Sequence, residues 1–262
     1  MPPNGPLPPG GGPFVVCDDR GVPDQGEKPA VPAATVIVLR DVATEVGTGL
    51  EVLMARRNTN LAFVGGHWVF PGGRIDAEDV DGGGDEEESA RRACVREAHE
   101  EVGLTIDADA LVGFAHWTAP PEAERRFATW FFAIAVGEAS ATNVDGGEIL
   151  ECRWLAPAVA LAEHAASSFP LAPPTWIALW QLVKAQDAAE ALAQSRERGF
   201  EVFSTRMAVA DGVLIALEPG DAGYDTGDPG RAGARHRLVM DDAAGWRYER
   251  KGLDGVPVEQ SG

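Results

Sequence analysis

The stretch that most constrains the fold is residues 96–104, which read Arg-Glu-Ala-His-Glu-Glu-Val-Gly-Leu. If this segment is helical, Glu97, Glu100 and Glu101 share one narrow sector, because residues three and four apart lie on the same helix face. Its apolar residues fall on a different sector, which gives the helix one side to bury. Three like charges this close repel one another, and a divalent cation with oxygen ligands would relieve the repulsion. The segment therefore predicts a half-buried helix with a metal-binding face.

Local signals predict where this helix begins and ends. Asp85-x-x-Glu88 has the form of a capping box, so the helix should begin near Glu86. Gly103 suits the left-handed position that ends a helix, and Leu104 can pack back on the last turn. The acidic and Gly-rich residues 76–88 before the helix are expected to form mainly a solvated loop.

The rest of the chain predicts an α/β protein. Residues 34–39 form a continuous β-branched run typical of a strand buried on both faces, and apolar runs at 50–55, 111–115, 127–136 and 149–155 predict further strands. The strand around residue 69 ends in Pro71-Gly72-Gly73, a turn whose glycines let backbone groups approach a ligand closely. Residues 157–164, 175–188 and 189–198 are expected to form helices.

Composition excludes several partners. The chain has 22 basic and 41 acidic residues and a formal net charge of −19, so nucleic acid and anionic membranes are unfavourable partners. A small phosphorylated substrate would need local cationic side chains and metal ions. The three cysteines show no paired spacing, which favours reduced thiols, and no apolar run reaches the length of about 18 residues that spans a membrane. A cytoplasmic protein is expected.

The helix also belongs to a longer spaced pattern. Gly82, five residues, Glu88, seven residues and then residues 96–104 match the Nudix box, and the chain resembles a Nudix hydrolase. A box usually opens directly after a Pro-Gly pair, which makes Gly73 the better structural match for the first glycine. That alignment implies a nine-residue acidic insertion. Ala98 stands where the box usually has a bulky aliphatic residue.

The resemblance implies an α/β/α sandwich with a mixed sheet and hydrolysis of the diphosphate in a nucleoside diphosphate derivative. It implies Mg²⁺ or Mn²⁺ as cofactor. Arg96 would orient a carboxylate, with Glu88 as its partner, and Glu100 or Glu101 would accept the proton of the attacking water. By similarity, the expected metal ligands are Glu97, Glu100, Glu101 and the carbonyl of Gly73.

A finer resemblance concerns the substrate. Leu53-x-x-Arg56 and the segment from Gly66 to Gly73 resemble the region before the box in coenzyme A diphosphatases, including the peroxisomal branch and its bacterial relatives. Coenzyme A carries an additional phosphate that needs extra cationic groups. The expected substrate contacts are Gly72, Gly73, Arg56, Arg57, Arg125 and Arg126, although each arginine could instead be solvated or form a structural ion pair. Glu148 is a candidate additional carboxylate, or a surface residue at a strand start.

Other interpretations stay open at this point. The same chemistry could act on NADH, ADP-ribose or a nucleotide sugar, the chain could be a non-catalytic Nudix-fold binding module, or the acidic helix face could simply be solvated. Many Nudix proteins are dimers, so the resemblance favours a homodimer. The expected organisation is a flexible Pro/Gly-rich leader (1–31), a Nudix domain (32–190) and a packed C-terminal extension (191–262) with helix and β-hairpin.

Overall fold

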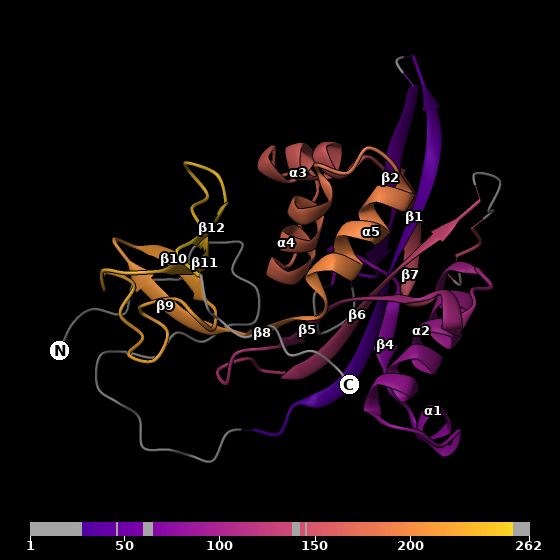
Figure 1. The fold of residues 1–262 in the computed structure, drawn as a ribbon, viewed down its shortest axis with the longest axis horizontal. Helices are drawn as coiled ribbons and strands as arrows, with labels where there is room; N and C mark the ends of the chain where they lie inside the picture. Colours follow the sequence, from indigo (N-terminus) through magenta and orange to yellow (C-terminus); the bar gives the residue numbers. More distant parts are fainter. Residues whose placement is uncertain (1–27, 46, 60–64, 138–141, 145, 254–262) are drawn as a thin grey trace.

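A mixed eight-stranded sheet forms the centre of the computed structural model, which describes residues 28–45, 47–59, 65–137, 142–144 and 146–253 (Figure 1). The strand order is β3-β2-β1-β6-β5-β8, with β4 beside β1 and β7 beside β2. β1 runs parallel to β6 and β5 runs parallel to β8, while the other pairs are antiparallel. The strands are β1 (Val31–Thr44), β2 (Gly47–Arg57), β3 (Trp68–Val69), β4 (Gly72–Arg74), β5 (Val112–Thr118), β6 (Phe127–Val136), β7 (Ile149–Leu155) and β8 (Glu201–Ser204).

One face of this sheet is covered by α2 (Glu86–Val102), which follows the short helix α1 (Ala77–Asp81). Small buried residues such as Ala90 and Ala98 line the buried side of α2 and let it pack closely against the branched side chains of β1. The predicted limits of α2 are confirmed: the Asp85 side chain accepts a hydrogen bond from the backbone N–H of Glu88, and Gly103 is left-handed with φ 70°. A short 3₁₀ turn, η1 (Ala108–Ala110), leads from α2 to β5.

Most acidic side chains of residues 76–88 are exposed, as expected, but residues 77–81 form the helix α1 and not a loop. Asp76 and Asp79 form a reciprocal capping box, which starts α1 and turns the Asp79 side chain inward. Gly82, Gly83 and Gly84 follow α1 as an exposed connection to α2. The acidic segment is therefore a folded element that adjoins α2.

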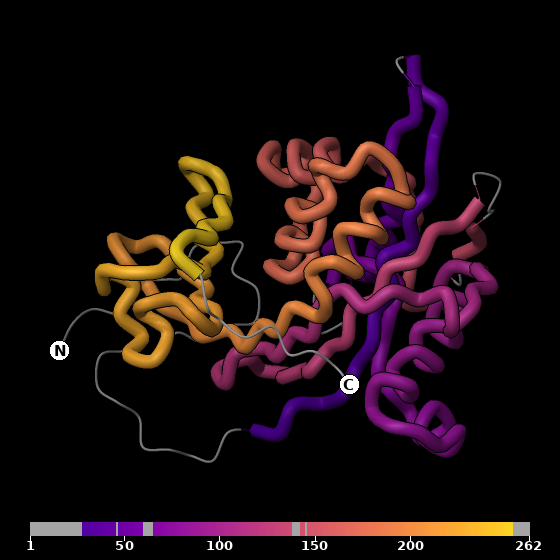
Figure 2. Tube along the Cα trace, in the orientation of Figure 1, coloured from indigo at the N-terminus to yellow at the C-terminus, as the bar shows by residue number. Residues whose placement is uncertain are grey.

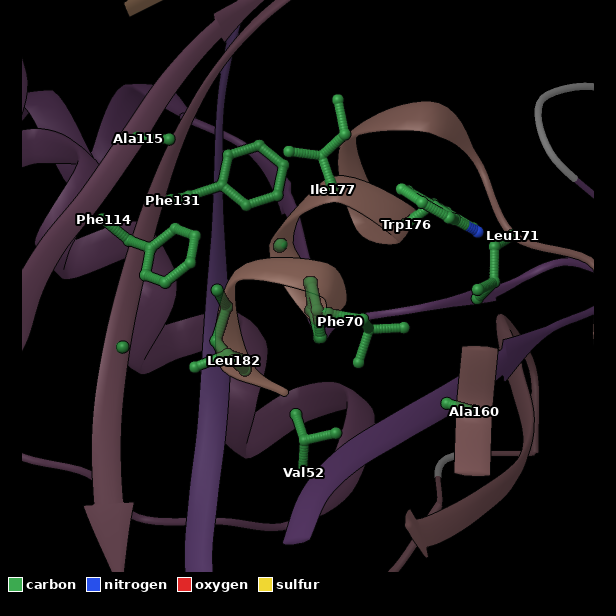
Figure 3. Close-up of a cluster of buried hydrophobic side chains, with 14 of the residues drawn as sticks. Val52, Phe70, Phe114, Ala115, Phe131, Ala160, Leu171, Trp176, Ile177 and Leu182 are labelled. Carbon is green, nitrogen blue, oxygen red and sulfur yellow. The ribbon is translucent and has the colours of Figure 1, made fainter. Parts of the chain in front are cut away.

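The opposite face of the sheet is covered by α3 (Pro157–Ala165), α4 (Pro173–Leu182) and α5 (Ala188–Arg198). Trp176, Ile177 and Leu182 of α4 pack toward Val52 and Phe131 in the larger of the two main cores (Figure 3). Helices on both faces of one mixed sheet confirm the predicted α/β/α sandwich, and the tube in Figure 2 shows the three layers. None of the helices within the described ranges is long and apolar enough to cross a membrane.

A second, antiparallel sheet follows in the order β12-β11-β10-β9 and lies to one side of the sandwich (Figure 1). The β-hairpin expected in the C-terminal extension is present as part of this larger sheet. Residues 191–262 were expected to form the C-terminal extension; the beginning of this range also contributes most of α5, and β8, to the sandwich. The strands of the second sheet are β9 (Arg206–Ala210), β10 (Val213–Leu217), β11 (Arg235–Met240) and β12 (Arg247–Lys251).

A buried polar chain connects the two sheets. The indole Nε1–H of Trp117 in β5 donates to Thr205 Oγ1 at 2.9 Å, and the Thr205 hydroxyl donates to Glu218 Oε1 at 2.7 Å. Glu218 is 0% exposed. Burial raises the pKa of its carboxyl group to about 8, because a charge there would lose its hydration. The folded protein therefore holds a proton that an unfolded chain releases at lower pH.

Glu218→Gln is expected to remove a pH-dependent part of the folding free energy. Because the folded-state pKa lies above the unfolded value, the native state binds more protons, and stability falls as pH rises from about 4.5 to about 8. At about pH 8.5 the variant should be more stable than the wild type by about 1 kcal/mol or more, and the difference should vanish near pH 4.5. Urea unfolding at both pH values measures this, with the exposed Asp211→Asn as control. Equal pH dependence in wild type and Glu218→Gln would contradict it.

Candidate active site

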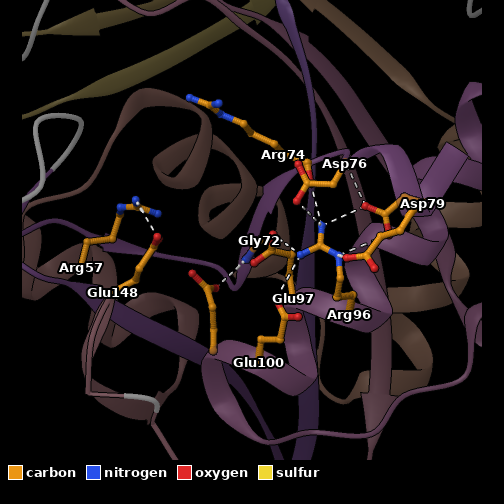
Figure 4. A network of polar contacts seen from close by, with 11 residues as sticks. Arg57, Gly72, Arg74, Asp76, Asp79, Arg96, Glu97, Glu100 and Glu148 are labelled. Atoms are coloured by element: carbon orange, nitrogen blue, oxygen red, sulfur yellow. Dashed lines mark hydrogen bonds and ion pairs between the residues drawn. The ribbon is translucent and has the colours of Figure 1, made fainter.

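Arg96 is the centre of the polar network on α2 (Figure 4). Its Nη2 and Nε atoms donate to the two carboxylate oxygens of Asp79 at 2.9 and 3.3 Å. Its Nη1 atom donates to Glu97 Oε1 at 2.9 Å and to Glu100 Oε2 at 3.1 Å. The backbone carbonyl of Arg74 accepts a further bond from Nη2 at 3.0 Å. One guanidinium therefore fixes α1, the end of β4 and two glutamates of α2 relative to one another.

The expected pairing of Arg96 with Glu88 is wrong, because the guanidinium of Arg96 pairs with Asp79 instead. Glu88 is exposed in the first turn of α2, where its backbone N–H is capped by Asp85. Asp79 is 4% exposed and makes a two-point contact with the guanidinium. Counted from Gly73, five residues precede Asp79, so the extra residues of the box lie between Asp79 and Arg96. This spacing signal was present in the sequence, beside the competing count from Gly82.

Arg92 connects the extra residues between Asp79 and Arg96 to Asp79 by hydrogen bonds. Its Nε atom donates to the carbonyl of Asp79, and its Nη2 atom donates to the carbonyl of Gly83 and to Ser89 Oγ. The backbone N–H of Asp76 also donates to Asp79 Oδ2 at 2.9 Å. Asp79 is therefore held from both its backbone and its side chain, which fixes the acceptor that Arg96 uses.

The Gly72-Gly73 pair lies directly against the glutamates of α2. The backbone N–H of Gly72 donates to Glu101 Oε2 at 2.9 Å, and a Cβ atom on Gly73 would lie only 2.1 Å from Glu97 Oε1. The predicted contact between the glycines and the acidic face is therefore present, but the prediction that these glycines form a turn is wrong, because they belong to strand β4 and pair with β1. Burial raises the pKa of Glu101 to about 8 and also raises the pKa of Glu97, and the charges of neighbouring glutamates add to both shifts. These carboxylates lie where additional positive charge would favour their ionised forms.

Gly72→Ala is expected to disrupt the contact between Gly72 and Glu101. A Cβ atom at position 72 would lie 2.4 Å from the carbonyl oxygen of Ala34 and 2.6 Å from the Cα of Thr35, both backbone atoms of the paired strand β1. The strands must separate locally, so we expect a loss of about 1–3 kcal/mol in unfolding free energy and a loss of activity. Thermal unfolding and kcat/KM measure the two effects. Gly212→Ala, between β9 and β10, controls for glycine replacement at positive φ, because a Cβ there meets nothing within 4 Å. Wild-type activity in Gly72→Ala would contradict the contact's role.

The four predicted substrate arginines lie in different places. Arg57 Nη2 lies 3.5 Å from Glu148 Oε2, and both groups act electrostatically on Glu101, so Arg57 and Glu148 border the acidic face (Figure 4). Arg56 is the neighbouring residue in β2 and pairs instead with Glu151, at 3.7 Å. Successive strand residues point to opposite faces of a sheet, which separates Arg56 from Arg57. Arg125 and Arg126 lie together in the connection between β5 and β6.

The glutamates suit a hard divalent cation in donor type and charge, because carboxylate oxygens are the ligands that Mg²⁺ and Mn²⁺ prefer. Within the described ranges, no three histidine, cysteine, aspartate or glutamate side chains are arranged as a complete metal site. Arg96 bridges Glu97 and Glu100 instead. The glutamates thus have the donor chemistry that a divalent cation needs. In this structure the positive charge beside them is that of Arg96.

Comparisons with known proteins agree with this architecture. The NUDIX domain profile matches residues 29–173. A crystal structure of a NUDIX hydrolase from Alicyclobacillus acidocaldarius superposes with a TM-score of 0.58 at 22% identity, covering 64% of this chain and 97% of that chain. This likeness shows the fold. The chain belongs to the Nudix family.

Relatives of the chain are named for several different activities. A candidate nudix hydrolase of Caenorhabditis elegans is 27% identical over 53% of this chain and 58% of its own length. A candidate 8-oxo-dGTP diphosphatase of Mycobacterium tuberculosis is 28% identical over 66% of this chain and 72% of its length. A peroxisomal coenzyme A diphosphatase of C. elegans is 38% identical over 34% of this chain and 32% of its length. The chain thus spans under two thirds of the first and third of these relatives.

Proposed function

We propose that this protein is a metal-dependent diphosphatase that cleaves the diphosphate of a nucleoside diphosphate derivative, with coenzyme A or an acyl-coenzyme A as its substrate. The observation that carries the proposal is the contact between the glutamate face of α2 and the Gly72-Gly73 pair of β4. It brings a concentrated set of oxygen donors against a backbone segment that has no side chains.

Each residue of the site has a role in this proposal. Glu97, Glu100 and Glu101 would hold the cation, with the Gly73 carbonyl as a further donor. A bound divalent cation would neutralise charge that develops on phosphate oxygens and would activate water. Arg96 keeps Glu97 and Glu100 in place, and Asp79 keeps Arg96 in place. Glu100 or Glu101 would accept the proton of the attacking water.

The substrate assignment rests on the local match to the coenzyme A diphosphatase and on the arginine and glycine segment before the box. A substrate panel tests it: coenzyme A, ADP-ribose, NADH and 8-oxo-dGTP with Mg²⁺ or Mn²⁺, with products identified by mass. We expect adenosine 3′,5′-bisphosphate and 4′-phosphopantetheine as the products from coenzyme A. Faster cleavage of another member of the panel would reassign the substrate, and turnover of none would favour a binding module.

A further inference from the structure

A second basic site lies away from the glutamate face. It is a cavity of about 300 Å³, here called the arginine cavity, at the start of β1. In a chain with a net charge of −19, four basic side chains gather there beside a single carboxylate. The charged residues that line it are Lys28, Arg74, Arg125, Arg126 and Glu124.

Strand pairing brings these residues together from three parts of the sequence. β1 lies between β4 and β6, so Ala33 pairs with Arg74 on one side and Val31 pairs with Phe127 on the other. The backbone N–H of Val31 donates to the carbonyl of Arg126 at 2.8 Å, which joins the connection before β6 to the start of β1. The cavity therefore lies where the start of β1 is hydrogen-bonded to its neighbouring segments.

The arginines of the cavity differ in their contacts. Arg126 is hydrogen-bonded to the cavity walls, whereas the side chains of Arg74 and Arg125 are exposed. Arg126 braces the walls, because its Nε donates to the Ala119 carbonyl at 3.0 Å and its Nη1 donates to the Lys28 carbonyl at 2.9 Å. Arg74 and Arg125 are exposed, and neither side chain has a hydrogen-bond or ion-pair partner among the residues that the structure describes. Two guanidinium groups can therefore receive an anion without first breaking an internal ion pair.

The arginine cavity adjoins the glutamate site through Arg74. The backbone of Arg74 directly follows Gly73, and its carbonyl accepts the hydrogen bond from Arg96. Its side chain leads away from Arg96 (Figure 4) and lines the cavity. A ligand whose diphosphate lies at the Gly72-Gly73 pair of β4 would thus have the cavity beside it.

We propose that the arginine cavity binds a phosphomonoester of the substrate, separate from the diphosphate that is cleaved. This inference rests on the proposed function and assigns to the arginine cavity the recognition of the additional ribose phosphate that coenzyme A carries. Guanidinium groups suit such a group, because they offer paired N–H donors that match phosphate oxygens.

Binding measurements on the full chain test the inference. Calorimetric titration would compare adenosine 3′,5′-bisphosphate with adenosine 5′-monophosphate, for the wild type, Arg125→Ala and Arg74→Ala. We expect the wild type to bind the bisphosphate about tenfold or more tightly than the monophosphate, because charged hydrogen bonds contribute at this level. Each variant should lose most of that ratio. Arg196→Ala, an exposed arginine on α5, should keep it, and thermal unfolding confirms that the variants fold.

The outcomes separate this inference from the proposed function. Equal wild-type affinity for the two nucleotides, or an unchanged ratio in Arg125→Ala, overturns it. If inorganic phosphate binds in an Arg125-dependent way while the bisphosphate gains nothing over the monophosphate, the cavity is a free-anion site, and the substrate assignment is overturned. If the ratio and its loss are both observed but no diphosphate is hydrolysed, the inference stands and the proposed function fails.

Discussion

Replacing Glu100 and Glu101 together by glutamine is expected to lower kcat/KM by at least about a thousandfold. Glutamine keeps the shape of each side chain and removes the negative charge that would hold a divalent cation. The fold should persist, because a glutamine at position 101 can still accept the hydrogen bond from the Gly72 N–H.

Two measurements check this result. Turnover of coenzyme A would be followed for the wild type, the double variant and Glu197→Gln, which changes an exposed carboxylate on α5. Mn²⁺ binding, measured by titration calorimetry without substrate, should weaken in the double variant only. Wild-type turnover in the double variant would assign the activity to another protein or to other residues.

Asp79→Asn is expected to lower kcat/KM about a hundredfold, whereas Glu88→Gln should change it less than about twofold. The asparagine removes the buried charge that faces Arg96, so the guanidinium loses its two-point partner. Arg96 keeps its contacts with Glu97, Glu100 and the Arg74 carbonyl, but its position is less fixed and the two glutamates shift with it. Because Arg96 keeps these partners, we expect a loss of about 1–3 kcal/mol in unfolding free energy.

The two variants together decide which acidic residue completes the box. Asp79→Glu, which keeps the charge but lengthens the side chain, should recover part of the activity if Asp79 acts by positioning Arg96. Thermal unfolding of all three variants separates loss of fold from loss of positioning. A large effect of Glu88→Gln combined with a small effect of Asp79→Asn would restore the pairing that the spacing from Gly82 first indicated.

The helix of the box was predictable because its signals are local. The cap at Asp85, the end at Gly103 and the glutamate face all follow from residues within about one or two helical turns. The partner of Arg96 was not settled in this way, because Gly73 and Gly82 each precede an acidic residue at the same spacing. Burial distinguishes Asp79 from Glu88, and burial depends on how α1 packs beside α2.

The positions of the arginines were also predictable only in part. The alternation of a strand already places Arg56 and Arg57 on opposite faces, so their separation could have been read from the sequence. The arrangement of Arg74, Arg125 and Arg126 around one cavity could not be predicted in this way. It depends on β1 pairing with both β4 and β6 across long stretches of chain. Non-local pairing of this kind leaves little trace in a single sequence.

The most direct test of the central claim is a time course of coenzyme A hydrolysis with Mg²⁺ or Mn²⁺, repeated with a chelator in excess. We predict adenosine 3′,5′-bisphosphate and 4′-phosphopantetheine in equal amounts, with turnover lost on chelation and restored by added metal. Intact coenzyme A in the presence of metal would contradict coenzyme A as the substrate. Equal cleavage with and without the chelator would contradict the metal-binding role of the glutamate face.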